Sequence, residues 1–221
     1  MQNFATPAAI VATLSVPAGR IRLIAADRTD TTVEVLPTDP SKSRDVKTAE
    51  RTEVAYADGV LTIEVPKSKG GILGGTGSID VTVQLPTGSR IEGQAAAAEL
   101  TAVGRFDAIA FEGAYREINL DEVANLRLTA VDGAVDVALI AGSSEITTAR
   151  GDIRIARALA GTVTLTTQLG DISIAAATGV SASLDAGTAY GRVNNSLKND
   201  GTSTLDIRAT TAYGDITARS L

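Results

Sequence analysis

Four related phrases decide how this chain folds: TTARGDIRIA (147–156), TTQLGDISIA (166–175), GTAYGRVNNS (187–196) and TTAYGDITAR (210–219). Each phrase places a glycine just before an aspartate or an arginine, and these glycines recur at intervals of about 20 residues, which is typical of solenoid and array proteins. We assign the turns of the repeat to Gly151, Asp152, Gly170, Asp171, Gly191, Gly214 and Asp215.

Between these turns, apolar and polar residues alternate, as in strands with one buried face. Ile172 and Ile174, for example, point one way and Asp171 and Ser173 the other. A second set of glycines splits each interval in two, so each repeat is expected to contain two strands and two turns. The sequence therefore predicts an all-β protein, a β-solenoid or β-roll of about 20-residue, two-strand coils with aliphatic rows inside.

The N-terminal part differs from the repeats. Residues 10–36 alternate as strands with a turn at 16–19, which predicts an antiparallel β-meander ahead of the coils. Asp39 before Pro40 predicts a short helix across 41–51, and Asp58-Gly59 predicts a hairpin. We expect an N-terminal β-meander or cap region over 1–88 and solenoid repeats over 89–221, packed as one continuous body.

Two stretches allow more than one interpretation. KSKGGILGGTGS (67–78) is expected to be a flexible hairpin loop, with an anion site as the alternative, since it lacks the Lys-Ser or Lys-Thr that ends a P-loop. QAAAAELTAV (94–103) has high helix propensity. Gly93 and Gly113 continue the repeat spacing on either side of it, so a strand is the preferred interpretation.

Composition narrows the possible functions. The net charge of −6 is spread over interspersed acids and bases, which argues against nucleic acid as a partner. The chain has no His and no Cys, which excludes His-based triads and thiol nucleophiles. We therefore expect no enzymatic activity and assign no catalytic residue, cofactor or metal site.

The N-terminal residues bear on localisation. MQNFATPAAIVATLSVPAG (1–19) lacks the basic start and the uninterrupted apolar stretch of a secretory signal. An apolar run of about 18 residues or more, long enough to span a bilayer, is absent from the sequence. These patterns predict no membrane insertion and a cytoplasmic protein.

Two sets of repeated residues suggest sites. The aspartates of the Gly-Asp phrases are expected to be solvated carboxylates at equivalent turns, with a divalent-ion ladder as the alternative. Tyr190 and Tyr213 occupy identical TAYG phrases one coil apart, so their rings are expected to lie about 5 Å apart. They are either a ladder that stabilises the coils or an interaction site for a sugar or a partner protein.

The order of elements also resembles a known family. VPAGRIRLIAADRTDTTVEVLP (16–37), ADGVLTIEVP (57–66), SIDVTVQLPTGSRIEG (78–93) and the T-x-x-G-D-I phrases look like bacterial β-strand-repeat proteins labelled "putative adhesin", a family of unknown function. The resemblance covers residues 10–219. It implies many envelope-associated relatives and supplies no catalytic residues.

Three functions are compatible with these patterns. We expect a non-enzymatic structural or interaction protein whose Thr-rich solenoid face binds another protein or a second copy. A carbohydrate-binding or envelope-stress-sensing module is the alternative, and a β-helical carbohydrate-active enzyme a second alternative. Because a solenoid ends in unpaired strand edges, we also expect weak self-association through the C-terminal coil AYGDITARSL (212–221).

Overall fold

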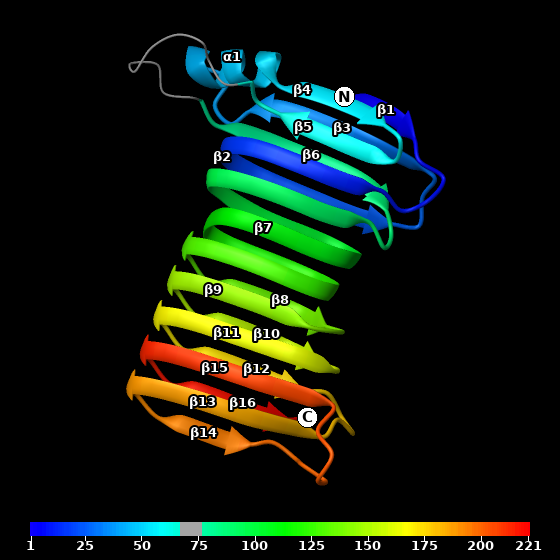
Figure 1. Cartoon of the computed structure of the whole chain (residues 1–221). Coiled ribbons are helices and arrows are strands. Elements are labelled where there is room, and N and C mark those ends of the chain that lie inside the picture. Colours follow the sequence, from blue (N-terminus) through cyan, green and yellow to red (C-terminus); the bar gives the residue numbers. More distant parts are fainter. Residues whose placement is uncertain (67–76) are drawn as a thin grey trace.

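A computed structural model of the chain describes residues 1–66 and 77–221 as a single elongated stack of strands (Figure 1). All of these strands belong to one hydrogen-bonded sheet that winds around itself. The predicted all-β solenoid is confirmed. The hypothesis about the glycine-rich stretch 67–78 falls almost wholly outside the described residues.

The stack begins with a cap that contains antiparallel strands. Its elements are β1 (Gln2–Ala5), β2 (Val11–Ala26), β3 (Asp30–Pro37), α1 (Ser43–Arg51), β4 (Glu53–Ala57), β5 (Val60–Glu64) and β6 (Ile79–Pro86). The predicted helix and the hairpin between β4 and β5 are both present, and the hairpin turn places Asp58 at φ 50° and Gly59 at φ 80°. β1, β3 and β6 form an antiparallel part, but the meander was predicted over residues 10–36, and β2 within that range pairs only in parallel.

Parallel coiling begins within this N-terminal region. The first half of β2 pairs in parallel with β5, and its second half with β6. β2 also pairs in parallel with β7 (Arg90–Asp132), which winds through 43 residues without interruption and contains the alanine-rich stretch 94–103 as a strand. The division of the chain at residues 88 and 89 stays a prediction.

Shorter strands build the remaining coils. They are β8 (Val135–Ile140), β9 (Ser144–Arg150), β10 (Ile153–Ala158), β11 (Gly161–Leu169), β12 (Ile172–Ala176), β13 (Ala182–Tyr190), β14 (Val193–Ser196), β15 (Leu205–Tyr213) and β16 (Ile216–Ser220). Coils stack in parallel and in register, as in the pairing of Ile153 with Ile172. The strand faces are as predicted, since Ile172 and Ile174 are buried while Asp171 and Ser173 are exposed.

The spatial order of the last coils differs from their order in the sequence. β15 lies between β11 and β13, and β16 lies between β12 and β14 (Figure 1). The expectation that the C-terminal coil ends the stack is therefore wrong. Both of its edges are paired, and Ile216 is fully buried, so the coil offers no free edge for self-association.

Side-chain chemistry explains this order. The inward residues of the C-terminal coil, such as Ile207, Ile216 and Ala218, are aliphatic and buried. The coil at the end of the stack instead places Asn195 opposite Ala218, and Asn195 is exposed. Burying an amide without partners costs free energy, so the coil with the polar residue lies where water reaches it. Terminal coils with a polar outer face are general in solenoids.

Burial predicts the effect of charges at two positions. Ile172→Asp places an unpaired charge in the core and should destabilise the protein by several kcal/mol, on the order of its whole stability. Thr164→Asp, on the outward side of β11 between Glu145 and Arg208, should change stability by less than about 0.5 kcal/mol. Thermal unfolding of both variants measures this, and equal losses would contradict the assignment of faces.

Candidate functional site

Every predicted turn residue lies at a corner of the solenoid, where one strand of a coil leads into the next. At the corners of Gly170, Gly191 and Gly214 a threonine three residues before the glycine donates its hydroxyl to a neighbouring coil, whereas Thr148, before Gly151, donates to the carbonyl oxygen of Arg150 in its own coil. Thr167 donates to the carbonyl oxygen of Gly151 at 3.1 Å, and Thr211 donates to that of Gly170 at 3.0 Å. A Cβ at Gly170, where φ is 153°, would lie 2.2 Å from the Gly151 oxygen, so the close approach requires glycine.

The aspartates after the glycines form a ladder from coil to coil. Asp152 accepts a hydrogen bond from the backbone N–H of Asp171 at 2.9 Å, and Asp171 accepts one from the N–H of Asp215 at 2.7 Å. Asp215 in turn accepts from the N–H of Arg192 at 2.9 Å. Each carboxylate therefore fixes the start of the adjacent coil. No cluster of acidic groups able to hold a metal ion occurs within residues 1–66 and 77–221.

Arg192 closes this ladder at the end coil. Its guanidinium donates to Asp215 Oδ2 at 2.7 Å and 3.2 Å. These hydrogen bonds, together with that from the Arg192 backbone, lower the pKa of the Asp215 carboxyl. The same pair raises the pKa of Arg192, so both groups stay charged at neutral pH.

Beside these turns stands a ridge of exposed apolar side chains, formed by Leu169, Tyr213 and Tyr190. They are the last residues of β11, β15 and β13, and they lie in register in adjacent coils. The predicted stacking of the two rings is present, with centroids 4.8 Å apart and planes 3° from parallel. We call these three residues the tyrosine ridge.

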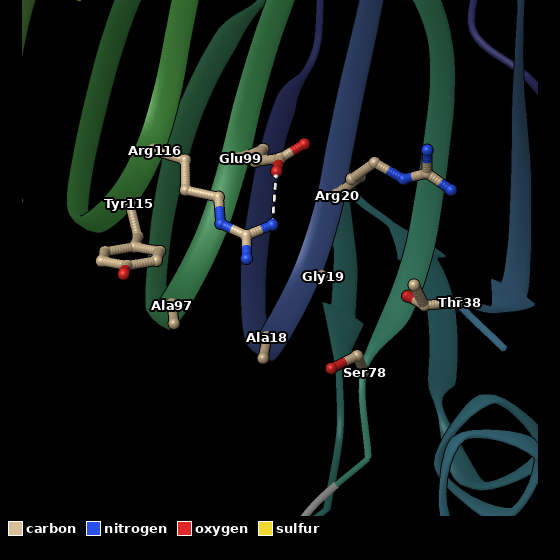
Figure 2. A pocket seen from close by; sticks show the side chains of 9 residues that line it. All are labelled: Ala18, Gly19, Arg20, Thr38, Ser78, Ala97, Glu99, Tyr115 and Arg116. Carbon is tan, nitrogen blue, oxygen red and sulfur yellow. Dashed lines mark hydrogen bonds and ion pairs between the residues drawn. The ribbon is translucent and has the colours of Figure 1, made fainter. Parts of the chain in front are cut away.

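Near the cap, the corners of the first coils border a pocket of about 480 Å³ (Figure 2). We call it the corner pocket. Its floor consists of small residues at the turns, and its walls carry hydroxyl, charged and aromatic groups. The lining residues are Ala18, Gly19, Arg20, Thr38, Ser78, Ala97, Glu99, Tyr115 and Arg116.

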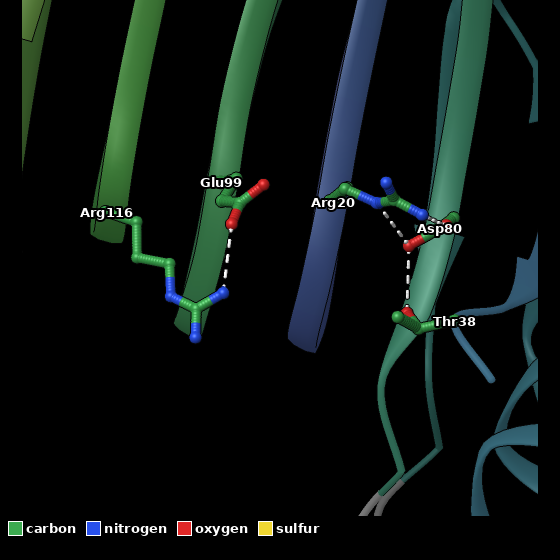
Figure 3. Close-up of polar contacts among 5 residues, drawn as sticks. All are labelled: Arg20, Thr38, Asp80, Glu99 and Arg116. Atoms are coloured by element: carbon green, nitrogen blue, oxygen red, sulfur yellow. Dashed lines mark hydrogen bonds and ion pairs between the residues drawn. The ribbon is translucent and has the colours of Figure 1, made fainter. Parts of the chain in front are cut away.

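Charges of alternating sign line up across the strands at this pocket (Figure 3). Arg20 donates to both carboxylate oxygens of Asp80, which also accepts from the Thr38 hydroxyl at 2.8 Å. Hydrogen bonding to Asp80 raises the pKa of Arg20 and keeps it charged. In the next coils, Arg116 donates to Glu99 at 3.2 Å.

The sequence prediction brought Tyr190 and Tyr213 together correctly but missed the corner pocket. One signal for it was present. AYREI (114–118) repeats the AYGDI of residues 212–216, with Arg116 in the place of the glycine. The partners across the pocket, such as Arg20 and Asp80, lie too far apart in the sequence for a local pattern to pair them.

A family model described as Toastrack DUF4097 matches residues 13–220. None of the curated proteins matches the chain.

Several solved structures are similar. A putative cell adhesion protein from Clostridium sporogenes ATCC 15579 shares 13% identity over 100% of this chain and 98% of that one, with a TM-score of 0.39. A putative adhesin from Bacteroides fragilis NCTC 9343 shares 15% identity over 98% and 95%, with a TM-score of 0.42. A putative adhesin from Parabacteroides merdae ATCC 43184 shares 10% identity over 100% and 93%, with a TM-score of 0.41.

The lowered pKa of Asp215 makes a pH-dependent prediction. A carboxyl whose pKa falls on folding stabilises the native state above its unfolded pKa of about 4, and this contribution is lost as the pH falls through the folded pKa. Asp215→Asn should lower the melting temperature at pH 7, and its difference from wild type should close as the pH is lowered below about 4.

Melting curves between pH 7 and pH 3 measure this difference. The matched control is Asp58→Asn in the exposed β4–β5 turn, where asparagine tolerates the same backbone conformation. A deficit in Asp215→Asn that does not change with pH would contradict the electrostatic role of the carboxylate.

Proposed function

The chain belongs to the Toastrack family, and we propose that it acts as a non-enzymatic binding module whose contact surface is the tyrosine ridge. The observation that carries the proposal is the exposure of three neighbouring large apolar side chains. Tyr190 is 67% exposed, and Tyr213 and Leu169 are each 54% exposed, although the fold buries long rows of aliphatic residues. A contiguous apolar patch that a protein keeps in water indicates an interaction surface.

The ridge has the composition of a binding hot spot. Tyrosine is enriched at interfaces because it presents a large apolar face and a hydroxyl at a small cost in conformational entropy. The two rings restrict each other by stacking, so binding would lose little further freedom. Strands of three paired coils hold the ridge, which makes it a rigid surface rather than a loop.

Charged groups lie at the edge of the ridge. Arg150 is in register with Leu169 in the adjacent coil, and the Arg192 and Asp215 pair follows the two tyrosines in the sequence. An apolar centre with a charged rim is the usual arrangement of a protein–protein contact. The partner class we propose is therefore another protein, with a second copy of this chain as one member of that class.

A carbohydrate partner is the second candidate. One face of the Tyr190 ring packs on Tyr213, while the other is directed toward the end of the stack, because β13 is the last strand there. A free aromatic face can pack on the apolar side of a sugar ring. The chain contains no His or Cys, which supports the non-enzymatic part of the proposal.

A membrane-spanning helix, long and apolar enough to cross a bilayer, does not occur in the described part of the chain. A cytoplasmic location stays a prediction that rests on the residue pattern of the first 19 residues alone.

Photo-crosslinking tests the ridge as a contact surface. A photoreactive phenylalanine analogue is placed at position 190 or, as the control, at position 36, where Leu36 is 50% exposed in the cap. In lysate of the native host, position 190 should give a specific adduct that excess wild-type protein competes away. The double variant Tyr190→Ser/Tyr213→Ser should compete about 100-fold less well.

Mass spectrometry of the adduct distinguishes the partner classes. A crosslink to the same chain identifies a second copy, and a crosslink to another chain identifies a different protein. If position 190 gave only the adducts that position 36 gives, the ridge would not be the contact surface.

A further inference from the structure

We propose that the corner pocket is a second site, independent of the tyrosine ridge, that binds a neutral saccharide. The pocket is lined by residues of β2 and of the first part of β7, near the cap, whereas the ridge is formed by β11, β13 and β15, which lie toward the opposite end of the stack (Figure 1). Its residues come from β2, β7 and the segments that flank β3 and β6.

Arg116 has an unusual backbone conformation. Its φ is 70°, in the left-handed region that favours glycine. A Cβ built on Gly133 would lie 1.6 Å from the carbonyl oxygen of Arg116, so both occupy the same corner of adjacent coils. The coils that follow keep glycine at this corner, at Gly151, Gly170, Gly214 and Gly191.

An arginine in this conformation is strained where glycine would not be. Strained residues of this kind cluster at binding sites, where the side chain does something that glycine cannot. The guanidinium of Arg116 lies 5.8 Å from the centroid of the Tyr115 ring and donates to Glu99. The strained residue thus lies with an aromatic ring and a carboxylate at one wall of the pocket (Figure 2).

These groups retain hydrogen-bonding capacity. Arg116 is the donor in one side-chain hydrogen bond within residues 1–66 and 77–221, and its guanidinium carries several N–H donors. Glu99 uses one carboxylate oxygen there, which leaves the other as an acceptor. The hydroxyls of Ser78 and Thr38 lie on the opposite wall, and that of Thr38, which already donates to Asp80, offers its oxygen as an acceptor.

The charges of the side chains at the pocket favour a neutral ligand over an anion. Arg20 and Arg116 are matched by Asp80 and Glu99, so the four side chains carry no net charge. A phosphate or another strong anion would gain little here, whereas a sugar offers hydroxyls to both the guanidinium and the carboxylate. The exposed Tyr115 ring can pack against the apolar face of a pyranose. The volume of about 480 Å³ lies within the range of small-ligand pockets.

Nuclear magnetic resonance with saturation transfer to the ligand tests the proposal on the full chain. The probes are the methyl glycosides of glucose, galactose, mannose and N-acetylglucosamine, cellobiose, methyl glucuronide and inorganic phosphate. At least one neutral sugar should bind, and Tyr115→Ala and Arg116→Gly should each weaken it by at least about tenfold.

Arg116→Gly separates binding from folding, because glycine adopts the native φ without strain and should melt no lower than wild type. Leu159→Ala removes an apolar side chain that is 37% exposed outside both the pocket and the ridge, so it is the matched control and should bind the sugar as wild type does. A panel without a sugar that binds, a sugar that either pocket variant retains at wild-type affinity, or binding of phosphate or glucuronide alone would overturn the proposal.

Discussion

The stack depends on how closely successive coils approach each other at their corners. At Gly151 and Gly170 the backbones come so near that no Cβ fits between them. At this contact a threonine hydroxyl donates to a backbone carbonyl of the adjacent coil, and an aspartate carboxylate accepts from a backbone N–H of the adjacent coil. These bonds join neighbouring coils in addition to the backbone hydrogen bonds between their strands. The T-x-x-G-D phrase recurs because each of its residues has a separate task in this contact. The strands between corners need only alternate, and their sequences vary accordingly.

The same contact explains why the phrase changes at the end of the stack. A carboxylate is useful only where another coil offers a backbone N–H to it. Asp152, Asp171 and Asp215 each have such a neighbour, whereas the last coil has Arg192, which turns back to Asp215. Asn195 in the same coil faces a core that is open to water. Two polar substitutions thus mark the last coil of the stack.

Local spacing accounts for what could be predicted from the sequence. The alternation of apolar and polar residues predicts which face of each strand is buried, and the interval between glycines predicts the length of a coil. The identical TAYG phrases predict that Tyr190 lies beside Tyr213. Local spacing does not predict the order of the last coils, because strands that are consecutive in the sequence need not be neighbours in the stack. The corner pocket was missed because it arises where the cap meets the first coils, and contacts such as that of Arg20 with Asp80 have no local signature.

The interleaved order of the last coils has a consequence for synthesis of the protein. Within the described structure, the only strands with which β13 and β14 pair are β15 and β16, which follow them in the chain. A solenoid ordinarily grows coil by coil as its residues leave the ribosome. Here residues 182–196 must wait until residues 205–220 have emerged and entered the gap beside β11 and β12. A nascent chain stalled before that point exposes the edges of two unfinished coils at once, which makes it a template for aggregation.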